Sequence, residues 1–269
     1  MLIPDFSLLE TVRLRRPLIH CISNLVSAND CANLALAVGA SPIMAQSLQE
    51  MEAIAAASAA AVLNTGTPDE EKFRVCLLRG REAARLGQPA ILDPVGIGAS
   101  LWRLERTEEL LEAFTPSLLR VNLGEAQALL HLESQERGVD SPAAGSLSQR
   151  AELARRLACE RGTVVLLSGP EDVVTDGAAL WRVSGGSARA AQVTGTGCML
   201  SVLCGVFAAV EGDILAAAVA AAAFWKVCSR RADALAEGRG PGSLRTALMD
   251  AAGTLRAADC AGAVQVQHI

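Results

Sequence analysis

The stretch "QPAILDPVG", residues 88–96, decides the fold prediction. Its centre is apolar at every position from residue 90 to residue 92, and Asp93, Pro94 and Gly96 then end it abruptly. A short run that is apolar throughout is typical of a strand covered on both faces. Proline and glycine directly after it mark a turn. We therefore expect a buried parallel strand that ends at Asp93.

The same pattern recurs along the chain. Five further runs resemble buried strands: "PLIHCIS" (17–23), "SPIMA" (41–45), "AAVLNTG" (60–66), "SLLRVN" (117–122) and "GTVVLLSG" (162–169). Segments with helical character lie between them, at about residues 28–38, 47–59, 69–86, 105–113, 124–131 and 148–161. This alternation predicts a mostly parallel sheet with helices on both faces. A length of 269 residues suits a single domain over residues 1–269.

The pattern changes after residue 168. Three short runs, "DVVTDG" (172–177), "ALWRVSGG" (179–186) and "ARAAQV" (188–193), predict antiparallel strands at one edge of the sheet. Ala-rich helices then close the chain. Its apolar runs 198–210 and 214–227 are each shorter than the ~20 residues that a membrane span needs, so we expect buried helices and no membrane association. Residues 133–149 are the one long polar stretch, and we expect a loop there.

Composition and charge exclude several classes of function. The net charge is −5, and the densest basic cluster is Arg13, Arg15 and Arg16, so nucleic acid is not an expected partner. The first residues lack the apolar core of a signal peptide, which favours the cytoplasm. Eight cysteines without any C-x-x-C pair indicate neither a zinc site nor a redox dithiol.

Polar or unusual residues stand at nearly every predicted strand end, where ligands bind in open parallel sheets. They are Asn24, Met44, the "NTGT" of residues 64–67, Asp93, the "RVNLGE" of residues 120–125, and Ser168. Asp93 and Glu125 are the two acids expected on this rim. Carboxylates there suit Mg²⁺ that is carried in with a nucleotide.

The stretch "VTGTGCMLS", residues 193–201, predicts an anion site. Gly195 and Gly197 leave backbone N–H groups accessible just before a helix expected to start at Cys198, as a transferring phosphoryl group requires. No GxxxxGK[ST] motif exists, and Leu200 replaces the last glycine of a GxGxxG fingerprint, which disfavours a P-loop protein and a dinucleotide dehydrogenase. At the first helical turn, the dipole is expected to lower the pKa of the Cys198 thiol below its usual ~8.5.

Seven motifs together resemble the hydroxyethylthiazole kinase family of the ribokinase-like superfamily. They are "ASPIMA" (40–45), "VLNTGT" (62–67), "ILDPVGIGA" (91–99), "RVNLGE" (120–125), "VTDG" (174–177), "VTGTGCMLS" (193–201) and "GPGS" (240–243), and they extend over nearly the whole chain in that family's order and spacing. The resemblance implies a three-layer α/β/α fold. It also implies transfer of the ATP γ-phosphoryl group to the primary hydroxyl of 4-methyl-5-(2-hydroxyethyl)thiazole, in thiamine biosynthesis.

The resemblance further implies roles for individual residues. Asn24, Met44, Gly66 and Gly195 match the substrate pocket, Arg120 and Ser168 the nucleotide site, Asp93 and Glu125 the magnesium site, and Gly195, Gly197 and Cys198 the catalytic turn. Cys198 stands where related sugar kinases have a catalytic aspartate. The family implies a homotrimer with active sites between subunits. Cys21 and Val121 depart from the family's usual asparagine and glycine.

Two other functions stay open at this point. A kinase for another small alcohol, such as hydroxymethylpyrimidine, would share the phosphate-binding residues and differ in the pocket around Asn24 and Met44. An ATP-dependent dehydratase that repairs hydrated nicotinamide nucleotides belongs to the same superfamily but to a different reaction class. A pure binding module is less favoured, because it would not need two acids facing an anion site.

Overall fold

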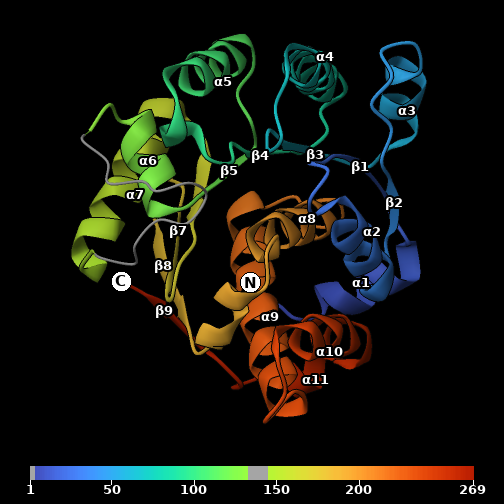
Figure 1. Cartoon of the computed structure of the whole chain (residues 1–269), viewed down its shortest axis with the longest axis vertical. Helices are drawn as coiled ribbons and strands as arrows, with labels where there is room; N and C mark the ends of the chain where they lie inside the picture. Colours follow the sequence, from blue (N-terminus) through green and yellow to red (C-terminus); the bar gives the residue numbers. More distant parts are fainter. Residues whose placement is uncertain (1–3, 133–144) are drawn as a thin grey trace.

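The computed structural model describes residues 4–132 and 145–269, and the described residues contain one nine-stranded sheet (Figure 1). The strands are β1 Leu18–Ile22, β2 Ser41–Ile43, β3 Ala60–Asn64, β4 Ala90–Asp93, β5 Leu118–Val121, β6 Val164–Leu167, β7 Asp172–Thr175, β8 Leu180–Ser184 and β9 Gln265–His268. Their order is β2-β1-β3-β4-β5-β6-β7-β8-β9. The pairs from β2 to β6 are parallel, and β7, β8 and β9 extend the sheet in antiparallel pairs.

Helices cover both faces of this sheet, which confirms the predicted three layers. They are α1 Leu8–Arg15, α2 Ala28–Ala37, α3 Met51–Ala57, α4 Glu70–Leu86, α5 Leu101–Ala113, α6 Leu123–Leu129, α7 Leu147–Arg161, α8 Thr196–Ala208, α9 Ile214–Leu235, α10 Pro241–Thr254 and α11 Ala257–Cys260, with short 3₁₀ segments η1 Ile97–Ala99 and η2 Ala188–Gln192. Figure 1 shows α3 to α7 on one face, and α1, α2 and α8 to α11 on the other.

The strands are apolar throughout because both of their faces are buried. Along β3, Ala60 and Val62 join the apolar cluster beneath α8 and α9, while Ala61 and Leu63 join the cluster beneath α4 and α5. Successive side chains of a strand point to opposite faces, so each helical layer takes alternate residues. The predicted strand of residues 88–96 is β4, and it ends at Asp93 as expected.

The edge of the sheet differs from the prediction in one segment. Residues 188–193 do not form a strand: residues 188–192 are the 3₁₀ segment η2. The Ser187 hydroxyl accepts from the main-chain N–H of Arg189 at 3.1 Å, and the Arg189 guanidinium pairs with Asp233 of α9 at 2.6 Å. These contacts hold the segment as a turn against α9. The place beside β8 is taken instead by β9, which the sequence pattern did not indicate.

The two apolar runs near the end of the chain form helices, as predicted. The first lies in α8 except for its last two residues, the second lies in α9, and both bury most of their residues. Among residues 4–132 and 145–269, no helix combines the length and the apolar character that crossing a membrane requires. Most of the predicted loop, residues 133–144, lies outside the described residues, and Ser146 already caps α7.

Candidate active site at the carboxyl ends of the strands

The predicted site residues meet where the chain reverses its direction across the sheet. From β1 the chain first adds β2 on one side, and it then returns to place β3 on the other side. Ligands bind outside the carboxyl ends of the strands at such a point. Asn24 follows β1, and Asn64 ends the adjacent β3; the Asn24 Nδ2 donates to Asn64 Oδ1 at 3.0 Å. The two predicted strand ends are therefore in direct contact.

Asp93 is the centre of a buried polar network. Its Oδ2 accepts hydrogen bonds from Asn64 Nδ2 at 2.8 Å and from Ser201 Oγ at 2.7 Å. Its Oδ1 pairs with the Arg120 guanidinium at 3.2 Å. The carboxylate is fully buried, so these partners replace the water that an ionised group would otherwise need. Three segments far apart in the sequence thus bind one carboxylate.

Arg120 links this network to the predicted anion site at the start of α8. Its Nη2 donates to Ser168 Oγ at 2.6 Å, which brings the two predicted nucleotide-binding residues together. A Cβ atom on Gly197 would lie 2.5 Å from Nη2, so the guanidinium packs directly against the glycine at the start of α8. Burial opposes the charged form of Arg120, but the carboxylates of Asp93 and Glu125 outweigh it and raise its pKa. A fixed positive charge therefore stands at this helix N-terminus.

Glu125 occupies the first turn of α6, within reach of the same charges. Its Oε2 accepts from the main-chain N–H of Asn122 at 2.8 Å in a capping box, and its Oε1 accepts from Gly96 N–H at 2.9 Å. Burial raises the pKa of Glu125 to about 7, Arg120 opposes this rise, and Asp93 adds to it. Glu125 therefore ties the loop after β4 to the start of α6.

Cys198 lies in the first turn of α8, but its electrostatics differ from the prediction. Helix α8 begins at Thr196, and Asn24 Nδ2 lies 3.2 Å from Cys198 Sγ. Burial and the charge of Asp93 raise the pKa of the thiol, so the predicted lowering by the helix dipole is wrong. Desolvation of a buried thiolate exceeds the partial charge of one helix end. At neutral pH the resting Cys198 is a thiol.

The remaining predicted pocket residues are placed unequally. Gly66 donates its N–H to Asn64 Oδ1 at 2.9 Å, and a Cβ at this position would come within 2.9 Å of Asn24. Gly195 has φ = +82°, a left-handed conformation that glycine adopts without strain. Met44 is half-buried and packs against the apolar core, and no polar contact joins it to the network. Gly66 and Gly195 thus border the network, whereas the contacts of Met44 are apolar.

Existing hydrogen bonds limit how Asp93 and Glu125 can bind Mg²⁺. Both oxygens of Asp93 and both oxygens of Glu125 already accept hydrogen bonds. In the part of the chain that the structure describes, no three His, Cys, Asp or Glu residues cluster as metal ligands. Mg²⁺ in nucleotide enzymes keeps several waters and takes other ligands from the phosphates. The two carboxylates therefore fit an ion held mainly through water and phosphate oxygens.

Three groups that support the site are absent from the predicted set. Ser201, one helical turn after Cys198, bonds Asp93 and was detectable from this spacing. Lys226 of α9 pairs with Asp172 at 3.0 Å and donates to the Gly169 carbonyl at 2.7 Å, which holds the loop after Ser168. No local pattern indicates this contact.

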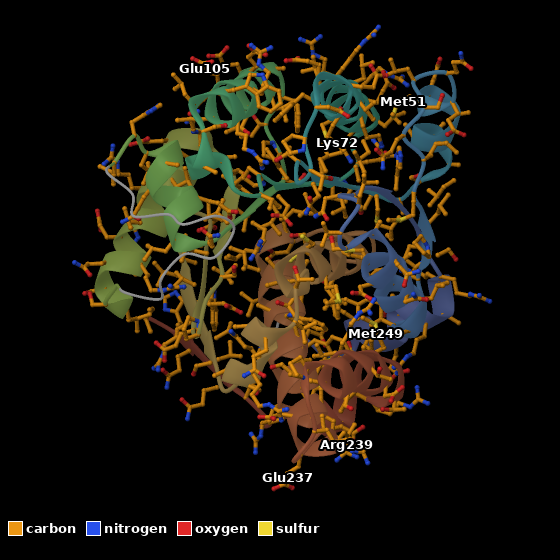
Figure 2. All side chains as sticks on the ribbon, viewed as in Figure 1. Met51, Lys72, Glu105, Glu237, Arg239 and Met249 are labelled. Atoms are coloured by element: carbon orange, nitrogen blue, oxygen red, sulfur yellow. The ribbon has the colours of Figure 1, made fainter. Side chains whose placement is uncertain are left out.

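Lys72 is the third such group. Its ammonium donates to the main-chain carbonyl of Ser23, immediately before Asn24, and burial lowers its pKa. Figure 2 shows Lys72 between α4 and the sheet, whereas Glu237 and Arg239 lie at the rim of the molecule. A lysine on the predicted helix 69–86 is expected to face solvent. The sequence alone therefore does not indicate that Lys72 contacts the Ser23 carbonyl.

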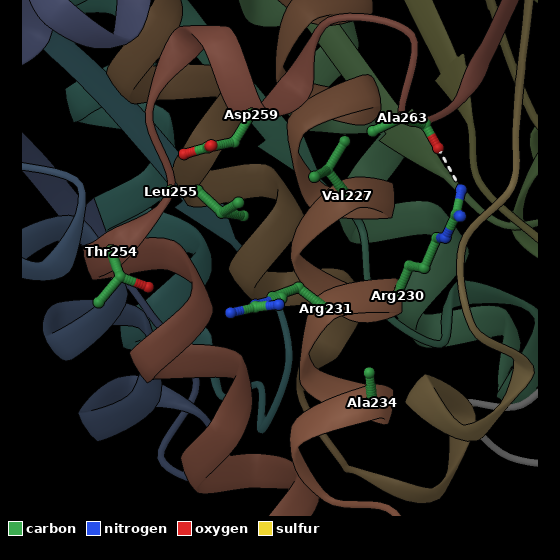
Figure 3. A pocket seen from close by; sticks show the side chains of 8 residues that line it. All are labelled: Val227, Arg230, Arg231, Ala234, Thr254, Leu255, Asp259 and Ala263. Atoms are coloured by element: carbon green, nitrogen blue, oxygen red, sulfur yellow. Dashed lines mark hydrogen bonds between the residues drawn. The ribbon is translucent and has the colours of Figure 1, made fainter.

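A separate cavity of about 520 Å³ lies between α9, α10 and α11 (Figure 3). Its lining includes Val227, Arg230, Arg231, Leu255 and Asp259, and none of the predicted site residues. Arg230 Nη1 donates to the Ala263 carbonyl at 2.5 Å, and the Asp259 carboxylate accepts from the main-chain N–H of Arg256 at 2.8 Å. These polar groups join the last helices to the segment before β9.

The chain is similar to known proteins over most of its length. A family model described as "Hydroxyethylthiazole kinase family" matches residues 9–258. A hydroxyethylthiazole kinase of Listeria monocytogenes serotype 4a (strain HCC23) is 42% identical over 247 residues, which cover 92% of this chain and 91% of that protein.

Solved structures agree with this match. The structure of a hydroxyethylthiazole kinase protein from Pyrococcus horikoshii OT3 superposes with a TM-score of 0.90 at 33% identity, covering 98% of both chains. A ribokinase-like superfamily protein from Enterococcus faecalis V583 has a TM-score of 0.59 at 14% identity, covering 87% of this chain and 86% of its own. At that identity the likeness concerns the fold alone, and it confirms the predicted ribokinase-like architecture.

Proposed function

The chain belongs to the hydroxyethylthiazole kinase family, and from this premise we propose that it transfers the γ-phosphoryl group of ATP to the primary hydroxyl of 4-methyl-5-(2-hydroxyethyl)thiazole. One observation supports this chemistry most directly: the Arg120 guanidinium packs against Gly197 at the N-terminus of α8. A fixed cation beside free main-chain N–H groups matches the charge of a phosphoryl group. The product is a thiazole phosphate for thiamine biosynthesis.

The first turn of α8 would hold the phosphoryl group during transfer. The N–H groups of Thr196, Gly197 and Cys198 have no helical carbonyl partner, as at every helix start. Arg120 adds a full positive charge next to them. Ser168 bonds this guanidinium and lies at the end of β6, so the nucleotide would approach from that side. These groups stabilise the equatorial oxygens of the transition state.

The thiazole alcohol would lie beside Cys198 and Asn24, on the side of β1. Phosphoryl transfer proceeds through a loose transition state, so orientation of the alcohol contributes more than a strong base. Cys198, held by Asn24, can orient the hydroxyl oxygen toward phosphorus, and its ionised fraction can accept the hydroxyl proton as the new O–P bond forms. Asp93 and Asn64 fix Asn24 from behind, because the three side chains are joined by hydrogen bonds.

We propose that Mg²⁺ accompanies ATP at Asp93 and Glu125, mainly through its bound water. When bound, the ion would neutralise phosphate charge. Asp93 and Glu125 accept hydrogen bonds from neighbouring groups, and the lone pairs that remain can accept from metal-bound water. Arg120 stands close to both acids, so it limits their repulsion.

We also propose a cytoplasmic, single-domain enzyme that assembles as a homotrimer with active sites between subunits. Directly after Asn24, the Leu25 side chain is 82% exposed and that of Val26 is 63% exposed. Large apolar side chains in this position, beside a substrate pocket, are typical of a surface that a partner covers. A second subunit there would close the pocket on the side of β1.

The decisive experiment compares candidate acceptor alcohols. Purified protein with MgATP and the thiazole alcohol should form ADP and the phosphate monoester at equal rates, measured by coupled ADP detection and mass spectrometry. Hydroxymethylpyrimidine and hydrated NADH are tested in separate reactions as alternative substrates. Arg120→Ala serves as the inactive control, because it removes the cation at α8. Efficient turnover of either competitor without thiazole phosphate would refute the proposal.

A further inference from the structure

Ser27 has an unusual local environment for a helix-capping serine. It occupies the N-cap position of α2, where a serine hydroxyl commonly accepts from a main-chain N–H of the first turn, yet its side chain makes no such bond. Ser27 is only 1% exposed, and within residues 4–132 and 145–269 its Oγ has no well-aligned hydrogen-bond partner. A buried hydroxyl that neither caps its helix nor reaches water points to a use elsewhere.

The surroundings of this hydroxyl belong to the active site. The main-chain N–H of Ser27 donates to Asn24 Oδ1 at 3.0 Å, so the residue is anchored to the first strand end. A Cβ on Gly195 would lie 2.8 Å from Ser27 Cβ, so the serine fills the space that this glycine leaves. The hydroxyl is also close enough to the thiols of Cys198 and Cys31 to lower the pKa of both.

We infer that Ser27 is a positioning residue for Cys198, whose Sγ accepts a hydrogen bond from the Ser27 hydroxyl after a small rotation of that side chain. Asn24 Nδ2 is already a donor to the same sulfur at 3.2 Å. Two donors from one side fix the orientation of the thiol toward the start of α8. This role rests on the proposed function, because it matters for catalysis only if the alcohol lies beside Cys198.

The charges that face Cys198 explain why a second donor matters. Asp93 disfavours its thiolate, while Arg120 and Asn64 favour it. Burial is the largest effect and opposes ionisation. A hydrogen bond from a hydroxyl stabilises the thiolate form of a cysteine. Ser27 therefore limits the rise in the pKa of Cys198. Cys31, one helical turn after Ser27 on α2, is the competing partner for the same hydroxyl.

The test is Ser27→Ala, with Ser58→Ala as the matched control. Ser58 is also buried, but its hydroxyl bonds the Ile54 carbonyl. The ¹³Cβ resonances of labelled cysteines are followed against pH, and Cys198 is assigned by the loss of its signal in Cys198→Ala. In Ser27→Ala we expect the pKa of Cys198 to rise by about one unit, the size of a hydrogen bond to a charged group.

Catalysis supplies the second measurement. The kcat of Ser27→Ala should be about tenfold lower at neutral pH and should recover at alkaline pH, following the thiol. The pKa of Cys198 and kcat should both stay unchanged in Ser58→Ala. An unchanged Cys198 titration in Ser27→Ala, or a shift confined to Cys31, would overturn the inference. The titration needs no turnover, so its result is independent of whether the thiazole alcohol is the substrate.

Discussion

Cys198 is the residue at which local and tertiary effects oppose each other. A helix N-terminus favours a thiolate, and Asn24 donates to its sulfur. Burial and the nearby Asp93 carboxylate favour the thiol and prevail. In the proposed mechanism Cys198 therefore orients the alcohol at neutral pH, and only a small fraction of it is ionised and able to accept a proton.

This balance leads to a measurable pH dependence. We expect kcat of the wild type to rise from neutral to alkaline pH, because the raised pKa of Cys198 leaves the thiol mostly protonated at pH 7. Cys198→Ala should lose about 10²-fold in kcat, at the lower end of general-base effects. Cys198→Asp should retain more activity than Cys198→Ala, and its kcat should rise less between neutral and alkaline pH than that of the wild type. Steady-state kinetics of the three proteins across pH check this, and near-normal activity of Cys198→Ala would contradict it.

At the scale of elements, the start of α8 and the end of β5 must approach closely. Gly197 permits this because its missing Cβ leaves space for the Arg120 guanidinium. In Gly197→Ala the new methyl group would lie 2.5 Å from Nη2 and must displace Arg120. Overpacking of this kind costs about 1–3 kcal/mol, and at this position it should appear as lost catalysis.

We expect Gly197→Ala to fold but to lose about 10²-fold in kcat/KM for ATP, the size of losing one transition-state donor. Gly212→Ala is the matched control, since a Cβ there would meet no atom within 4 Å. The test measures kcat/KM for ATP and the melting temperature of both variants. Equal kcat/KM in the two variants would mean that the contact between Arg120 and Gly197 has no catalytic role.

A second contact between elements joins β1, α4 and the segment after β2. Arg79 Nε donates to His20 Nδ1 at 3.0 Å, so His20 Nε2 carries the proton and donates to the Ala45 carbonyl at 2.8 Å. Burial, with a smaller contribution from the Arg79 charge, lowers the pKa of His20 to about 4. The neutral ring thereby holds the main chain next to Met44.

This histidine makes stability depend on pH. The unfolded chain binds a proton near pH 6.5 and the folded chain only near pH 4, so the contribution is complete above pH 6.5 and is lost as pH falls toward 4. The loss amounts to about 3 kcal/mol of unfolding free energy. Urea unfolding at several pH values measures it. In His20→Gln, whose amide can make both bonds, we expect a smaller loss over the same interval; an identical loss would exclude His20 as its source.

At the scale of the whole molecule, assembly is the property most open to test. Light scattering should give a mass three times the 27.9 kDa of one chain. Leu25→Lys should weaken the trimer and raise KM for the thiazole alcohol together, because Leu25 lies next to Asn24. Leu101, which is exposed on α5 across the sheet, provides the control variant Leu101→Lys. A monomeric wild type at micromolar concentration would rule out the proposed assembly.

The sequence by itself determined the order of most elements and the place where the candidate site residues gather. Runs such as residues 88–96 carry both the strand and the polar residue at its end, and parallel strands bring those ends to one edge. Asn24, Asn64, Asp93, Arg120 and Ser168 therefore meet as their positions predicted. Local patterns suffice for such features because each depends on neighbouring residues and on one general rule of topology.

Only the tertiary structure decided the direction of the Cys198 pKa shift, the environment of Ser27 and the identity of the edge strand. Each depends on groups far apart in the sequence: Asp93 faces Cys198, Gly195 borders Ser27, and His268 pairs with Trp181 of β8 in the place expected for residues 188–193. Burial and electrostatic interaction depend on distance in space. Local sequence patterns do not specify that distance.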